Sequence, residues 1–227
     1  MKFLYISASN IVGTKSEEST SYKICKITKN LLQDKYRNEM HSILELKNYS
    51  LTSCIGCGKC WISHRCIFND DFNDIYTQII DSDFLMFVSP HYAPIPAKLA
   101  ALLEKMEQIT FLHWGADNSY KSEVYGKPTA IISHGGGSDW ALKSYKLMVN
   151  DTIANALDTI QLKLIPFNDE WNTGISLPVD KVSFSTKSIF PEQSYNWEYL
   201  TSLISNYIDV IIHNITDIPN QPKIKIM

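Results

Sequence analysis

The sequence lacks a long apolar run and an excess of charge of either sign. None of its 227 residues fall in a stretch of the roughly 18 apolar residues that a membrane-spanning helix requires. Its start, MKFLYISASN, has only a short apolar stretch and no signal-peptide pattern. Lys and Arg total 21 against 24 Asp and Glu, a net charge of -3, so no global field attracts nucleic acid or anionic lipid. We therefore expect a cytoplasmic protein with no nucleic-acid or membrane partner.

Several catalytic and nucleotide-binding motifs are also missing. The chain has nine glycines, but they form neither a GxGxxG dinucleotide fingerprint nor a Walker loop with GK[ST]. No Ser/His/Asp or Cys/His order indicates a hydrolase. These absences argue against a dinucleotide-binding Rossmann domain, a P-loop nucleotidase and a nucleophilic hydrolase.

The sequence does contain enough apolar residues for a sizeable core, at 44% hydrophobic and 20% charged. Its length favours one domain over 1–227, with a core over about 1–166 and a C-terminal extension and helix over about 167–214. Short apolar runs predict five buried strands, and helical periodicity falls between them. The strands are expected at 2–6, 42–46, 84–88, 129–133 and 162–166, and the helices at 21–32, 70–80, 96–106, 140–157 and 197–213.

This alternation predicts an α/β fold with a doubly wound, five-stranded parallel sheet in the order 2-1-3-4-5, with helices on both faces. Such sheets bind ligands beyond the carboxyl ends of their strands, near the switch point between strands 1 and 3. Three loops fall at that edge. They are 7–21, which has seven hydroxyl side chains, 89–96, which has three prolines, and 133–138, which has three consecutive glycines.

Each loop supports a ligand-binding and a purely structural interpretation. Hydroxyls and N–H groups at a helix start suit a phosphate, yet Ser19, Thr20 or Ser21 could simply cap the helix. The proline loop could press against a flat ligand or could only be a stiff connection. The glycines could allow close approach of a ligand or merely a sharp turn, and His134 beside them could donate a hydrogen bond or be an ordinary polar group.

Taken together, these segments resemble the flavodoxin-like NAD(P)H-dependent FMN reductases, a family that includes the iron–sulfur flavoproteins. The resemblance covers about residues 1–165. It implies FMN as cofactor, NAD(P)H as co-substrate, a small acceptor such as a quinone, flavin or nitro compound, and a homodimer or homotetramer. The chemistry is the flavin's, so no catalytic side chain is implied. The resemblance also implies three groups of FMN contacts. They are Ser9, Thr20 and Ser21 at the phosphate; Pro90, His91, Tyr92, Ala93 and Ile95 at the ring; and His134, Gly135, Gly136 and Gly137 on its other side.

Four of the five cysteines, Cys54, Cys57, Cys60 and Cys66, follow a C-x2-C-x2-C-x5-C spacing. Thiolates this close suit an iron–sulfur cluster or zinc, and the same segment could also be an empty thiol loop or a redox disulfide. The resemblance gives the cluster a function, because a [4Fe-4S] iron–sulfur flavoprotein would exchange electrons with a ferredoxin-like partner. That is the alternative function. Cys25, on the apolar face of the first helix, is expected in the core, and Asp70 and Asp71 are expected in the first turn of their helix.

Overall fold

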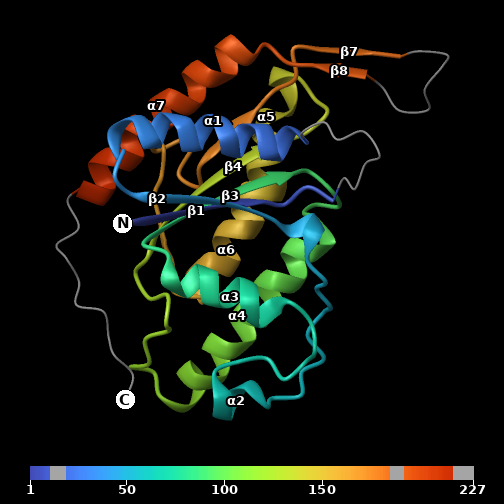
Figure 1. Ribbon diagram of the computed structural model, residues 1–227. Coiled ribbons are helices and arrows are strands. Elements are labelled where there is room, and N and C mark those ends of the chain that lie inside the picture. The colour runs from blue at the N-terminus through green and yellow to red at the C-terminus, as the bar shows by residue number, and fades with distance from the viewer. Residues whose placement is uncertain (11–18, 185–191, 217–227) are drawn as a thin grey trace.

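A parallel sheet forms the centre of the computed structural model, which describes residues 1–10, 19–184 and 192–216. Its strands follow the order β2-β1-β3-β4-β5, and the predicted topology is confirmed (Figure 1). Strand β1 pairs in parallel with both neighbours, with Leu4 opposite Ser42 on one side and Leu85 on the other. The strand bounds are β1 (Lys2–Ser7), β2 (Met40–Glu45), β3 (Phe84–Pro90), β4 (Pro128–His134) and β5 (Lys163–Leu164).

Helices cover both faces of this sheet, which explains why every residue of β3 and β4 is buried. Helices α1 (Thr20–Lys35) and α7 (Trp197–Thr216) pack together on one face. On the other face lie α3 (Phe72–Asp81), α4 (Ala97–Ala116) and α6 (Asp151–Thr159) (Figure 1). Within the described ranges, no helix is both long enough and apolar enough to cross a bilayer.

Helix α1 begins one residue earlier than its periodicity predicts, because Ser19 is its N-cap. The Ser19 hydroxyl accepts a hydrogen bond from the Tyr22 N–H at 3.2 Å. Cys25 is fully buried on the inner face of this helix, as predicted. One hydroxyl therefore caps the helix, and the capping interpretation does not account for Thr20 and Ser21.

Two helix predictions need correction. Helix α4 continues ten residues past 106 to Ala116, because Ile109, Thr110 and His113 keep its buried face apolar or hydrogen-bonded. The helix expected over 140–157 is segmented, since a π turn interrupts it where Asn150 turns inward and donates to the Ile175 carbonyl. The segments are η2 (Asp139–Ala141), α5 (Leu142–Tyr145), η3 (Lys146–Asn150) and α6; the remaining short helices are η1 (Leu46–Asn48) and α2 (Cys60–Ser63).

The fifth strand is shorter than predicted, and the extension supplies a second strand beside β4. After β5 the chain leaves the sheet and returns as β6 (Ile175–Leu177), which pairs in parallel with the carboxyl half of β4. Gly174 makes the return possible, because its φ is +102° and a Cβ there would collide with the Ile131 carbonyl. Strands β7 (Lys181–Ser183) and β8 (Glu192–Ser194) then form an antiparallel hairpin.

Candidate functional site

The carboxyl ends of β1, β3 and β4 lie side by side, so the three predicted loops meet at one edge. Backbone hydrogen bonds hold them together: the Ala8 N–H donates to the Val88 carbonyl at 2.9 Å. The His91 N–H donates to the His134 carbonyl at 2.8 Å. The edge is therefore a defined surface on which a ligand could contact all three loops.

The predicted phosphate residues gather where β1 ends and α1 begins. Ser9 and Ser21 are buried, and Thr20 is half-buried at the first position of α1. The first N–H groups of a helix have no partner within the helix, and its dipole favours an anion there. Two further hydroxyls of the loop, Thr14 and Ser16, lie outside the described residues.

Ser21 has a partner that the sequence did not indicate. Its hydroxyl lies 2.7 Å from Nε2 of His134, and both side chains are buried. Burial lowers the pKa of His134 to about 3, so the imidazole is neutral at physiological pH. His134 thus points to the helix start rather than to the side of the glycine loop.

The residues predicted to line the ring form a stiff loop after β3. Pro90 is buried as the last residue of that strand, and Ile95 packs against the hydrophobic core. Tyr92 is 43% exposed at the edge, and Ala93 is exposed with a left-handed φ of +47°. The loop therefore presents an aromatic side chain and backbone to solvent at the place predicted for a flat ligand.

The glycine run makes room for a protein side chain. A Cβ on Gly135 would lie 2.5 Å from Cζ of Tyr145, and a Cβ on Gly137 would collide with Ala141. The Tyr145 hydroxyl accepts a hydrogen bond from the Gly137 N–H at 2.5 Å, and its ring lies 5.5 Å from that of His91. Tyr145 therefore links the second and third loops, a role that its position in a helix did not indicate.

The edge fits the phosphate and ring of FMN in the chemistry of its groups. Buried hydroxyls lie beside a helix N-terminus, and an exposed tyrosine stands on the stiff loop after β3. Ser7 adds a buried hydroxyl on the α1 side of the sheet that has no hydrogen-bond partner in the described part of the chain. Unpaired buried hydroxyls are costly, and a ligand at this edge would offer an acceptor.

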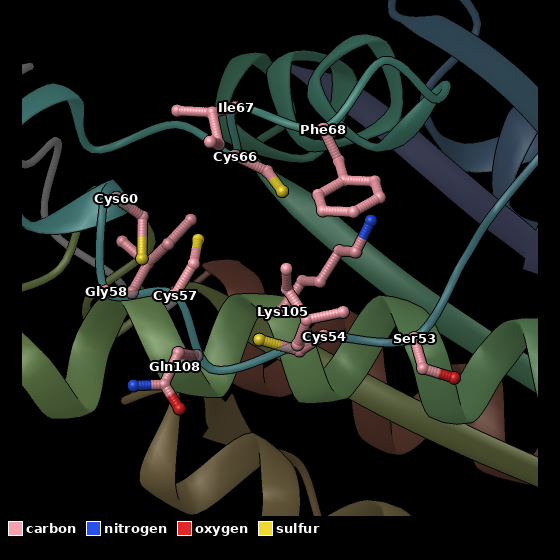
Figure 2. Close-up of a pocket in the computed structure, with 12 residues that line it drawn as sticks. Ser53, Cys54, Cys57, Gly58, Cys60, Cys66, Ile67, Phe68, Lys105 and Gln108 are labelled. Atoms are coloured by element: carbon pink, nitrogen blue, oxygen red, sulfur yellow. The ribbon is translucent and has the colours of Figure 1, made fainter.

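A pocket lies against α4 and contains the cysteine cluster. Cys54, Cys57, Cys60 and Cys66 all line it, and Figure 2 shows their thiols around one space together with Lys105. The α4 residues that line it, Lys105, Gln108 and Ile109, lie about 12 to 18 Å along the helix axis from Ala97, at 1.5 Å per residue. No described residue of the three loops lines this pocket.

An ion pair fixes the wall of this pocket. Nζ of Lys105 lies 2.5 Å from Oδ2 of Asp70, and both side chains are only 2% exposed. Burial alone would raise the pKa of Asp70, but hydrogen bonds from Lys105, Thr52 and the Phe72 N–H outweigh it, and the pKa falls below its usual value. The nearby Glu104 carboxylate accepts from the Cys54 N–H at 2.9 Å.

The expected placement of Asp70 and Asp71 in the first turn of a helix is therefore wrong. Both precede α3, and the Asp71 carboxylate accepts from the Ser50 N–H at 2.6 Å instead of capping its own helix. The two carboxylates tie the loop before the cysteines to the start of α3. The contacts of Glu104 and Lys105 with this segment were not predicted from the sequence, because only the fold brings α4 against this loop.

The four cysteines share a pocket without forming a metal site. All are free thiols, and no three His, Cys, Asp or Glu residues among those described are grouped closely enough to hold a metal ion. Cys60 is buried, and burial raises the pKa of its thiol, which disfavours the thiolate that a metal would bind. The iron–sulfur and zinc interpretations stay predictions.

Solved structures share this fold at low identity. A structure of RosB with a bound 8-demethyl-8-formylriboflavin-5'-phosphate intermediate is 10% identical, with a TM-score of 0.57 over 96% of this chain and 81% of that one. The apo form of the NADH:FMN oxidoreductase EMOB is 14% identical, with a TM-score of 0.55 over 97% and 91%. Flavodoxin 2 from Bacillus cereus is 12% identical, with a TM-score of 0.51 over 94% and 99%. No curated protein matches the chain.

The family is shown by sequence. The family model for NADPH-dependent FMN reductase matches residues 1–162, which include all three loops of the edge and the four-cysteine segment. FMN is accordingly the cofactor and NAD(P)H the co-substrate, and the fold is flavodoxin-like. The chain belongs to the NADPH-dependent FMN reductase family and is an NAD(P)H-dependent FMN oxidoreductase.

Proposed function

We propose that the protein transfers electrons from NAD(P)H to a small acceptor, such as a quinone, a free flavin or a nitro compound. The observation that carries this proposal is the shared carboxyl edge of β1, β3 and β4, which combines buried hydroxyls with the 43% exposed Tyr92. Bound FMN supplies hydride acceptance and electron donation. The protein's part is to hold the cofactor and leave its ring accessible.

Ser9, Thr20 and Ser21 are proposed to hold the phosphate. Ser21 gains from its neutral partner: when Nε2 of His134 carries the ring proton, it donates to the Ser21 oxygen and leaves the hydroxyl proton for the phosphate. Thr20 and Ser21 also offer backbone N–H groups at the first turn of α1. His134 is then a positioning residue rather than a direct ligand of the cofactor.

The ring is proposed to lie between the second and third loops. Pro90, His91, Tyr92, Ala93 and Ile95 form one side of this site, where an exposed Tyr92 can also contact a flat acceptor. The other side is the backbone of Gly135, Gly136 and Gly137. The Tyr145 ring packs against Gly135, and its hydroxyl accepts a hydrogen bond from the Gly137 N–H.

A homodimer or homotetramer is also proposed. Three apolar side chains on the helical segments after the glycine loop are exposed: Trp140 at 80%, Leu147 at 68% and Met148 at 46%. Exposed apolar side chains of this size suit contact with a second copy. Light scattering on the purified protein tests this proposal, and a monomer at micromolar concentration would contradict it.

The test of the function is steady-state oxidation of NADH and NADPH by the FMN-loaded protein, with each class of acceptor in turn. We expect one nicotinamide to be oxidised, at a rate that depends on the acceptor. Absence of turnover with every small acceptor would contradict the proposal. Iron and sulfide assays on the same anaerobic preparation test the iron–sulfur alternative. About four irons per chain would support it, and none would reject it.

A further inference from the structure

The C-terminal extension reaches the cofactor edge, although the family match ends before it begins. The Val179 N–H donates to the Gly137 carbonyl at 3.1 Å, and the hydroxyls of Ser133 and Ser176 lie 2.7 Å apart. Figure 1 shows the β7–β8 hairpin projecting at the end of the molecule where α1 begins. The extension is thus placed beside the first and third loops of the site.

Two side chains of the extension come closest to these loops. Nε2 of Gln193 lies 2.8 Å from the position that a Cβ on Gly136 would take, so the amide rests on the glycine turn. Two residues on, the Tyr195 hydroxyl donates to Oε1 of Gln193 at 2.9 Å. Tyr195 thereby sits between the glycine turn and the start of α1.

Tyr195 also lies next to the helix start. Burial raises the pKa of the Tyr195 hydroxyl, and the nearby Thr20 side chain offsets part of that rise. The ring of Tyr195 is held by Trp197, with ring centroids 5.1 Å apart, and Nζ of Lys23 lies 3.9 Å above the Trp197 ring. Lys23 belongs to the first turn of α1, so this contact places Trp197 and the neighbouring Tyr195 of the extension beside that turn.

We propose that Tyr195 is a further ligand of the FMN phosphate, contributed by the extension. The inference rests on the proposed binding of the phosphate at Thr20 and Ser21. The Tyr195 hydroxyl donates its proton to Gln193 in the absence of phosphate. When FMN is bound, the same proton would be donated to a phosphate oxygen. The rotation needs no backbone movement, because Trp197 fixes the ring and only the O–H turns.

Comparison of FMN with riboflavin isolates this contact, because the two ligands differ only in the phosphate. Apoprotein is titrated with each flavin, and quenching of flavin fluorescence gives the Kd. For Tyr195→Phe we expect about a tenfold higher Kd for FMN, typical of a hydrogen bond to a charged group, and an unchanged Kd for riboflavin. Tyr199→Phe is the matched control, because Tyr199 is exposed in the first turn of α7. This substitution should change neither Kd.

A second variant keeps the ring of Tyr195 and removes its competing acceptor. Gln193→Leu should tighten FMN binding and leave riboflavin binding unchanged. Equal losses for both flavins in Tyr195→Phe, or no loss for FMN, would overturn the inference, as would weaker FMN binding by Gln193→Leu. If the wild-type protein binds riboflavin as tightly as FMN, the proposed phosphate site itself fails, and this inference fails with it.

Discussion

The hydroxyl of Ser21 and Nε2 of His134 lie 2.7 Å apart, although 113 residues separate them in the sequence. The contact joins the start of α1 to the end of β4, two of the three places proposed to contact the cofactor. Both side chains are buried, so protonation of His134 changes the free energy of unfolding, which therefore depends on pH.

His134 should make the folded protein less stable as the pH falls below 6.5. Burial lowers its pKa to about 3 in the folded state, against 6.5 for the unfolded chain, so between these values only the unfolded chain binds the proton. This one group should therefore remove about 1.4 kcal/mol of the free energy of unfolding between pH 7.5 and 5.5. Urea unfolding at the two pH values measures the loss.

The matched variant is His134→Gln, which keeps an N–H donor for Ser21 but does not titrate. All carboxylates are the same in both proteins, so the difference between their pH dependences isolates His134. Parallel curves for the two proteins would show that His134 is not buried and neutral as described.

Ser7→Ala should stabilise the apoprotein and weaken FMN binding. The Ser7 hydroxyl is buried without a partner in the described part of the chain, and its removal should add about 1 kcal/mol to the free energy of unfolding. If FMN offers it an acceptor, the Kd for FMN should rise severalfold. Ser82→Ala is the control, since the buried Ser82 hydroxyl donates to the Ile79 carbonyl at 2.7 Å and its loss should destabilise. A destabilised Ser7→Ala apoprotein would contradict this account.

Gly135→Ala should lower the free energy of unfolding by about 1–3 kcal/mol, because the new methyl group would overlap the ring of Tyr145. Gly115→Ala offers a comparison in the last turn of α4, where nothing lies within 4 Å of a new Cβ. There the same substitution should be neutral or slightly stabilising, as expected for alanine in a helix. Thermal unfolding of both variants measures the difference, and equal effects would show that Tyr145 does not fill the space beside Gly135.

Lys105→Met should cost about 3 kcal/mol, since it leaves the carboxylate of Asp70 buried without its cation. The double variant Lys105→Met with Asp70→Asn should recover much of this loss, because the amide can still accept from Thr52 without carrying a charge. Chemical unfolding of the wild-type protein, of both single variants and of the double variant gives the coupling. A double variant no more stable than the single one would argue against the pair as the anchor of the cysteine pocket.

The sequence predicted the sheet well because its strands are buried on both faces and stand out as short apolar runs. β3 and β4 extend only one or two residues beyond the predicted ends. The order of strands and the edge with three loops followed from general rules of α/β folds rather than from any single residue. The positions of the three loops at the sheet edge were likewise available from the sequence, and their assignment to the phosphate and ring of FMN stays a prediction.

The interactions within the site were less predictable, because they join residues distant in the chain. Glycines 135–137 indicated close approach, but only the structure shows that Tyr145 fills the space. Residues 168–193 have no clear period, since β6, β7 and β8 are three residues long each. The position of Gln193 and Tyr195 beside the site could therefore not be predicted from the sequence.

The most direct test of the central claim is an anaerobic titration of the apoprotein with FMN, followed by addition of NADPH or NADH. The account predicts uptake of one FMN per chain and loss of the flavin's visible absorbance on addition of a stoichiometric amount of one nicotinamide. An apoprotein that takes up no FMN, or bound FMN that neither nicotinamide reduces, would contradict it.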